Sequence, residues 1–161
     1  MEFQEADIND ARVVREIYNK HIDGGNSTMD LEKKSLEDVE DWFKEFSSRE
    51  LIVLLKEDDH VLGWGIIKRY SDRAGYTKTC ETAIYLRLGE TRKGYGSQMK
   101  KWIIEKCKVL EYHHLVAKIF ASNTASIEYN KKLGYEIVGR QKEIGYINNH
   151  WQDVIIMQLL I

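Results

Sequence analysis

Apolar residues recur with two different periods along the chain, and this separates expected helices from expected strands. Helical spacing follows Asp10, the expected cap of the first helix, and continues to Gly24; it returns after Ser35, which forms a capping box with Asp38. Two apolar runs flank Glu57-Asp58-Asp59 and predict a β-hairpin. Further helices are expected at 94–110 and 124–133, and strands at 3–6, 51–55, 61–67, 79–88, 114–121, 135–141 and 151–160.

The order of these elements predicts an α/β fold. Two helices come early, a run of strands follows, and the second half reads β-α-β-α-β-β, which suits one mixed sheet. A length of 161 residues with 43% hydrophobic residues is enough for one core, and the sequence has no proline or linker-like tract. We therefore expect a single domain over residues 1–161.

Composition narrows the class of protein. The formal net charge of -2 disfavours a general nucleic-acid binder, and no apolar run reaches the roughly 20 residues of a membrane helix. The acidic N-terminus lacks a signal core, and Cys80 and Cys107 have no metal or redox spacing. We expect a cytoplasmic protein with reduced cysteines and no metal; His113 and His114, as strand neighbours, point to opposite faces.

The segment from Glu81 to Ser97 carries the first candidate chemistry. A strand ends in a turn, Thr91-Arg92-Lys93-Gly94-Tyr95-Gly96-Ser97, that opens the long helix. A helix N-terminus presents backbone N–H groups without internal partners and the positive end of the dipole. Glycines there permit close approach of a ligand, and the two basic side chains add charge, so the turn suits a pyrophosphate.

Three phosphate-binding motifs compete for this turn. Gly89 and Gly94 have the glycine spacing of a Walker A loop, but Tyr95-Gly96 replaces its lysine and hydroxyl residue. A dinucleotide fingerprint would require a third glycine where Met99 stands. The remaining pattern, R/Q-x-x-G-x-G/A, is weak by itself, because an ordinary helix-opening loop has the same glycines.

A second segment makes the pattern specific. Residues 123–135, Asn-Thr-Ala-Ser-Ile-Glu-Tyr-Asn-Lys-Lys-Leu-Gly-Tyr, follow the turn by about thirty residues, and both segments together resemble the GNAT acetyltransferases. Within that superfamily the chain is similar to the phosphinothricin/methionine sulfoximine N-acetyltransferase group over nearly its whole length. The matching pieces are Ile17-Tyr18-Asn19, residues 61–65, 70–76 and 81–86, and Gly145-Tyr146 with Trp151-Gln152-Asp153.

The resemblance implies a GNAT fold, with about seven strands in a mixed sheet that is splayed in the middle and has helices on both faces. It implies acetyl-CoA as co-substrate, with the pantetheine arm beside the strand at Ile84, Tyr85 and Leu86, where a free N–H near Leu86 would stabilise the oxyanion. The expected pyrophosphate residues are Arg92, Lys93, Gly94, Tyr95, Gly96 and Ser97, and Asn123, Ser126 and Asn130 would contact the arm. Thr91 departs from the usual arginine or glutamine.

For catalysis the resemblance implies Glu81 as the base that deprotonates the acceptor ammonium, directly or through water. Many family members place a tyrosine at Asn130, and this group often a histidine, to protonate the departing thiolate. Asparagine cannot act as a general acid, and adjacent Tyr129 points about 100° away on the helix. Solvent is the open alternative as proton donor.

For the acceptor, the candidate contacts are Thr28, Arg73, Tyr76 and Glu81, because a guanidinium suits the carboxylate of an amino-acid-like amine. Two other acceptors stay open, a protein N-terminus and a polyamine, as does a non-catalytic acyl-CoA binding module. A homodimer is the habit of the family, and the apolar strand from Trp151 to Ile161 is compatible with one.

Overall fold

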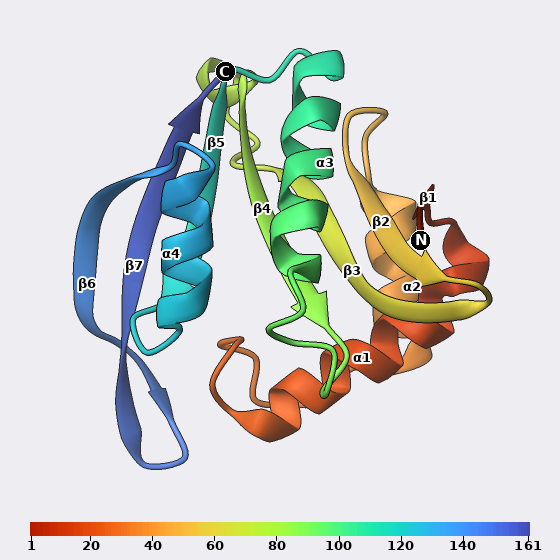
Figure 1. Ribbon diagram of the computed structural model, residues 1–161, viewed down its shortest axis with the longest axis horizontal. Coiled ribbons are helices and arrows are strands. Elements are labelled where there is room, and N and C mark those ends of the chain that lie inside the picture. Colours follow the sequence, from red (N-terminus) through yellow and green to blue (C-terminus); the bar gives the residue numbers. More distant parts are fainter.

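The computed structural model describes residues 1–161 and has four α-helices, two short 3-10 turns and seven strands (Figure 1). Side chains cap two of the helices: Ser35 and Asp38 form the expected capping box of the second, and Asn123 caps the fourth. The helices are α1 (Ala11–Gly24), α2 (Leu36–Glu45), α3 (Tyr95–Val109) and α4 (Thr124–Lys132). The strands are β1 (Glu2–Glu5), β2 (Leu51–Glu57), β3 (His60–Arg69), β4 (Thr79–Leu86), β5 (His114–Phe120), β6 (Glu136–Ile147) and β7 (His150–Leu160).

All seven strands belong to one mixed sheet in the order β1-β2-β3-β4-β5-β7-β6. Every neighbouring pair is antiparallel except β4 and β5, which run parallel with α3 as their crossover. This architecture confirms the expected fold class.

Successive side chains of the inner strands point to opposite faces of the sheet and belong to two separate hydrophobic cores. In β2, Ile52 and Leu54 join the cluster beneath α1 and α2, whereas Val53 and Leu55 join the cluster beneath α3 and α4. The four side chains are at most 1% exposed. The helices therefore cover both faces of the sheet, and each face has its own apolar contact surface.

The sheet opens in its middle. Only three residue pairs join β4 to β5, from Thr79 opposite His114 to Glu81 opposite Val116, and beyond them the two strands diverge (Figure 1). The remaining residues of β4 stay paired with β3 as far as Leu86. The main-chain groups of β4 that face β5 consequently have no partner strand past Glu81.

Several element predictions need correction. The Asp10 carboxylate accepts from the Asp7 N–H (3.0 Å) and does not cap α1 with its side chain. The strand expected to reach Leu88 ends at Leu86, because the turn toward α3 begins there. The strand expected at 135–141 continues to Ile147, because Gly145 to Ile147 also pair with β7.

The C-terminal strand β7 lies between β5 and β6, so it is an inner strand whose two edges are occupied.

None of the helices combines the length and apolar character that crossing a membrane requires.

Candidate active site

The gap between β4 and β5 forms a narrow groove on the α3–α4 side. Its walls include Thr82 to Tyr85 of β4, Ala117 to Phe120 of β5, and residues of α3 and α4, around a cavity of about 80 Å³. The Arg87 N–H donates to Leu62 O of β3 (2.8 Å), and hydrogen-bonding sides alternate along a strand. The main-chain groups of Ile84 and the N–H of Leu86 therefore face the groove, where an extended amide chain can bond to them.

The turn before α3 provides free donors at one end of this strand. The backbone N–H groups of residues 92–97 donate to no acceptor within the protein; the first bond of the helix runs from Gln98 N–H to Gly94 O (3.1 Å). Gly94 has a left-handed conformation, φ 81°, with nothing within 4 Å of the side where a Cβ would stand. These N–H groups and the helix dipole are suited to a diphosphate, as the sequence predicts.

The two basic side chains of the turn differ. Lys93 Nζ pairs with Glu90 at 2.9 Å, so much of its charge is already neutralised, whereas Arg92 has no ion-pair partner within 4.0 Å. Gly96 is buried, and its Cα faces the Tyr129 ring, which a Cβ would approach to 3.2 Å. The role of Gly96 thus includes the packing of α3 against α4.

In α4, the side chain of Asn130 has one polar atom without a hydrogen-bond partner. The residue is 1% exposed and lines the groove; Nδ2 donates to Ser126 O at 2.8 Å, but Oδ1 is buried without a hydrogen-bond partner. A buried unpaired carbonyl is costly, and an amide N–H of a pantetheine arm would satisfy it. The residues that line the groove therefore fit acetyl-CoA.

The other predicted residues of α4 lie beside Asn130. The Asn123 side chain caps the helix by accepting from the Ser126 N–H (3.1 Å), which leaves its Nδ2 available to the groove it lines. The Ser126 hydroxyl donates to the Tyr129 Oη (3.1 Å). Burial raises the pKa of Tyr129, so its phenol keeps its proton at neutral pH.

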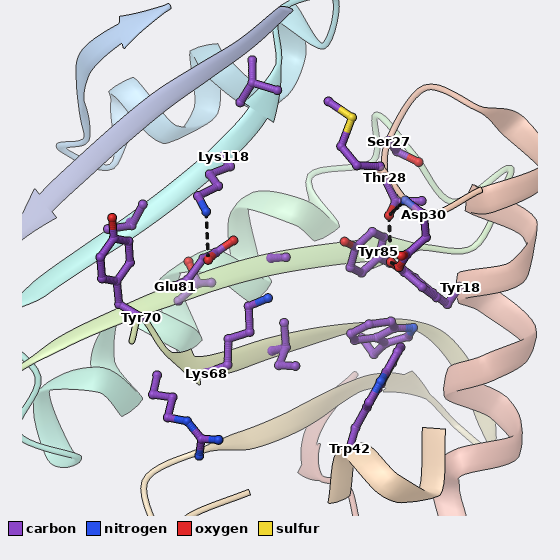
Figure 2. A pocket seen from close by; sticks show the side chains of 18 of the residues that line it. Tyr18, Ser27, Thr28, Asp30, Trp42, Lys68, Tyr70, Glu81, Tyr85 and Lys118 are labelled. Carbon is purple, nitrogen blue, oxygen red and sulfur yellow. Dashed lines mark hydrogen bonds and ion pairs between the residues drawn. The ribbon is translucent and has the colours of Figure 1, made fainter. Parts of the chain in front are cut away.

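A second, larger cavity of about 980 Å³ opens on the α1–α2 side of the same strand (Figure 2). Glu81 lines it at one end, with a side chain 18% exposed, and Lys118 of β5 faces it with Nζ 3.4 Å from Oε2. Since Thr82, Ala83, Tyr85 and Lys118 line both cavities, the groove and the larger cavity meet at the splay. A carboxylate base and a thioester could meet there.

Tyr18, Thr28, Asp30 and Tyr85 form the opposite end of the cavity (Figure 2). The Tyr18 hydroxyl bonds to Thr28 Oγ1 at 2.7 Å and donates a short bond to the Asp30 carboxylate. Burial raises the pKa of Tyr18, and it raises that of Tyr85 to about 12, so both rings stay neutral. Thr28 is thus placed in the cavity wall, as predicted.

The structure does not bring Arg73 and Tyr76 into the cavity wall. Arg73 is exposed and precedes the 3-10 turn Ala74–Tyr76, and Tyr76 is exposed with its ring 5.2 Å from Tyr70. Tyr70 does line the cavity, as do Lys68 and Arg69 at the end of β3. The residues of this segment that face the cavity are therefore those before the 3-10 turn, and not the two that were predicted.

Two residues that were not predicted add to the site: His21, which contacts the cavity residue Ser27, and Lys68, which lines the larger cavity. His21 Nε2 donates to Leu86 O (2.7 Å) and Nδ1 accepts from the Ser27 hydroxyl (2.7 Å), while burial lowers the pKa of His21 and keeps it neutral. Lys68 is the cross-strand partner of Glu81 and has no ion-pair partner within 4.0 Å. Its position on a strand end gave no signal, because exposed lysines are common there.

Comparison with known proteins agrees with this geometry. The family model described as an acetyltransferase (GNAT) domain matches residues 4–156. The chain belongs to the GNAT acetyltransferase family. As an acetyltransferase of this family it uses acetyl-CoA, and the groove and turn are the parts that fit that co-substrate.

Relatives of this acetyltransferase include an L-methionine sulfoximine/L-methionine sulfone acetyltransferase of Pseudomonas aeruginosa, 27% identical over 97% of this chain and 92% of that protein. A Bacillus subtilis protein provisionally named a phosphinothricin acetyltransferase is 31% identical over 94% of each chain. The crystal structure of a phosphinothricin acetyltransferase from Sinorhizobium meliloti in complex with acetyl-CoA is 25% identical, with a TM-score of 0.93 over 99% of this chain and 88% of that chain.

The difference between Arg92 and Lys93 gives a matched test of the diphosphate site. We expect Arg92→Gln to raise the dissociation constant of acetyl-CoA about tenfold, since it removes an unpaired cation worth about 1.4 kcal/mol. Lys93→Gln should have a smaller effect, because Glu90 already offsets that charge. Calorimetric titration at low and high salt would measure both; an equal loss, or a larger one for Lys93→Gln, would contradict this account of the turn.

Proposed function

We propose that this enzyme acetylates the amine of a small amino acid or amino-acid analogue, of the phosphinothricin or methionine sulfoximine type. The observation that carries the proposal is the free ammonium of Lys68 beside Glu81 in the larger cavity. An amino acid brings a carboxylate close to its amine, and a cation next to the expected base matches that spacing. The names of the relatives support the same acceptor class.

The charges of the cavity wall support this choice of cation. Arg69 is engaged by Glu50 (3.0 Å) and Asp72 (2.7 Å). Lys118 faces Glu81, and Lys34 pairs with Asp30 (3.5 Å). Lys68 is thus the basic wall residue that remains available to a ligand (Figure 2). Its side chain extends over the sheet between Glu81 and the Tyr18–Asp30 end, where the carboxylate of a bound acceptor would lie.

In the proposed mechanism Glu81 accepts a proton from the acceptor ammonium, directly or through a water, because only the neutral amine is a nucleophile. The amine then attacks the thioester carbonyl at the splay. The backbone N–H of Leu86 faces the groove and stabilises the oxyanion, and His21 holds the carbonyl of the same residue. The acetyl group passes directly to the amine, without a covalent enzyme intermediate.

A homodimer is a further part of this proposal. Exposed apolar side chains gather on the β6–β7 hairpin: Ile144 (57%), Tyr146 (52%) and Trp151 (62%). The Tyr146 and Trp151 rings pack together at 4.8 Å. An apolar surface of this kind is typical of protein contacts, and it includes Trp151, the first residue of the predicted C-terminal strand, which is compatible with a homodimer.

The acceptor class is tested with a panel of amines and release of the free thiol as readout. Phosphinothricin and methionine sulfoximine should be acetylated with a higher kcat/KM than a polyamine or a peptide N-terminus. Lys68→Met should raise KM about tenfold for acceptors that carry a carboxylate and leave carboxylate-free amines unchanged, since one charge-assisted contact is lost. Lys20→Met, on the exposed side of α1, is the control. A polyamine or peptide as the best substrate would overturn the proposal.

The role of Glu81 is tested separately by Glu81→Gln, which keeps the shape of the side chain and removes the base. We expect kcat to fall by about 100-fold or more at neutral pH, and the ratio of variant to native kcat to rise at high pH, where the amine is already neutral. Glu128→Gln, at an exposed position of α4, should turn over normally. A Glu81→Gln profile that equals that of the native enzyme at every pH would remove Glu81 from the mechanism.

A further inference from the structure

Lys100 of α3 is a buried lysine that the mechanism above does not use. The residue is 2% exposed, and it lies on the helix face that also carries Gly96, Ile103, Ile104 and Cys107. A lysine on such a face normally costs stability, because its charge is removed from water. No carboxylate lies within 4.0 Å of its Nζ to offset this cost.

The Lys100 ammonium opens onto the groove. Lys100 lines the same cavity as Asn130, and Nζ donates one hydrogen bond, to Thr82 Oγ1 of β4 at 2.7 Å. The Tyr135 ring lies 4.8 Å from Nζ on another side. An ammonium group has three donors, so two of them remain for a ligand in the groove.

We propose that Lys100 is the general acid that protonates the departing thiolate of coenzyme A. The proposal rests on acetyl transfer, which the family assigns, and not on the identity of the acceptor. When the carbon–sulfur bond breaks, its electron pair goes to sulfur, and Nζ transfers a proton that forms the S–H bond. Lys100 is left as a neutral amine and regains a proton from solvent, which receives the proton that the acceptor lost.

The surroundings of Lys100 suit this task. Burial lowers its pKa to about 8, close to the roughly 8.5 of a free thiol, so transfer to the thiolate is nearly balanced. The titratable groups that face it are Cys107 of α3, Cys80 of β4 and Tyr135 after α4, and Lys118 of β5 lines the same groove. Both cysteines are buried and free, and the contact with Cys107 together with burial raises the pKa of Cys80, so the Cys80 thiol supplies no counter-charge.

Lys100 also supplies the general acid that is missing at position 130, where this chain has asparagine. Asn130 cannot donate a titrating proton, and the raised pKa of Tyr129 makes proton loss from its phenol unfavourable near neutral pH. Lys100 and Asn130 reach the same groove from two helices, α3 and α4. We infer that Asn130 binds the pantetheine arm and that Lys100 supplies the proton to the thiolate.

Three variants separate proton transfer from charge and from packing. Lys100→Met should lower kcat by about 100-fold, with little change in KM for acetyl-CoA, and should abolish the fall in kcat above about pH 8. Lys100→Arg keeps the charge but does not release a proton in this range, so it should not restore kcat. Lys101→Met, the exposed neighbour, should behave as the native enzyme.

A second readout needs no acceptor and no turnover. In the complex with coenzyme A, ultraviolet absorbance of the thiolate gives the pKa of the bound thiol. We expect a value below 8.5 in the native enzyme and in Lys100→Arg, and a higher value in Lys100→Met, because a nearby cation favours the thiolate. Thermal melting should show that Lys100→Met is folded, and Lys100→Gln serves if it is not.

The outcomes decide the proposal. If Lys100→Met, or Lys100→Gln in its place, turns over with the native pH profile, or if the thiol pKa is the same in all proteins, Lys100 does not face the sulfur and has a structural role. Normal turnover by Lys100→Arg would show charge stabilisation in place of proton transfer. A wrong acceptor class would leave the thiol titration unchanged, so the two proposals fail separately.

Discussion

The separation of β4 from β5 is the constraint on which the rest of the structure depends. Main-chain N–H and C=O groups in a protein interior need partners, and a sheet normally supplies them along the full length of its strands. Here three residue pairs hold the strands together before they part. The unpaired stretch of β4 is stable only next to water or a ligand with amides of its own, and this makes the middle of the sheet a binding site.

Two hydrophobic cores, one on each face of the sheet, stabilise the fold around this opening. The cluster beneath α3 and α4 spans both halves of the sheet, from Val53 and Leu55 of β2 to Ile155 and Met157 of β7, so the halves are tied together below the gap. The cluster beneath α1 and α2 holds Trp64 against Tyr18 and forms the wall of the larger cavity. Each side of β4 thus has one opening, the narrow groove on the α3–α4 side and the larger cavity on the α1–α2 side.

The sequence predicted the elements well, because they depend on local signals. The residues expected to bind acetyl-CoA came from the family resemblance, since the glycine turn before α3 is weak evidence by itself; the free N–H groups of residues 92–97 are a consequence of helix geometry. The larger cavity depends on which side chains of distant segments converge, so Lys68 lines it without having been predicted, and Arg73, which was predicted, is not part of its wall. Lys100 had a signal that went unused, because it is a charged residue on the apolar face of the clearest helix.

Acetyl-CoA binding to the unpaired main-chain groups of the turn and of β4 is the central claim, and amide hydrogen exchange tests it directly. In the free protein, residues 92–97 should exchange quickly, because their N–H groups have no acceptor. On addition of acetyl-CoA, exchange should slow in residues 92–97 and in 82–86, with no change in the distant hairpin turn at 57–60. Protection confined to other segments, with these two unaffected, would contradict the account.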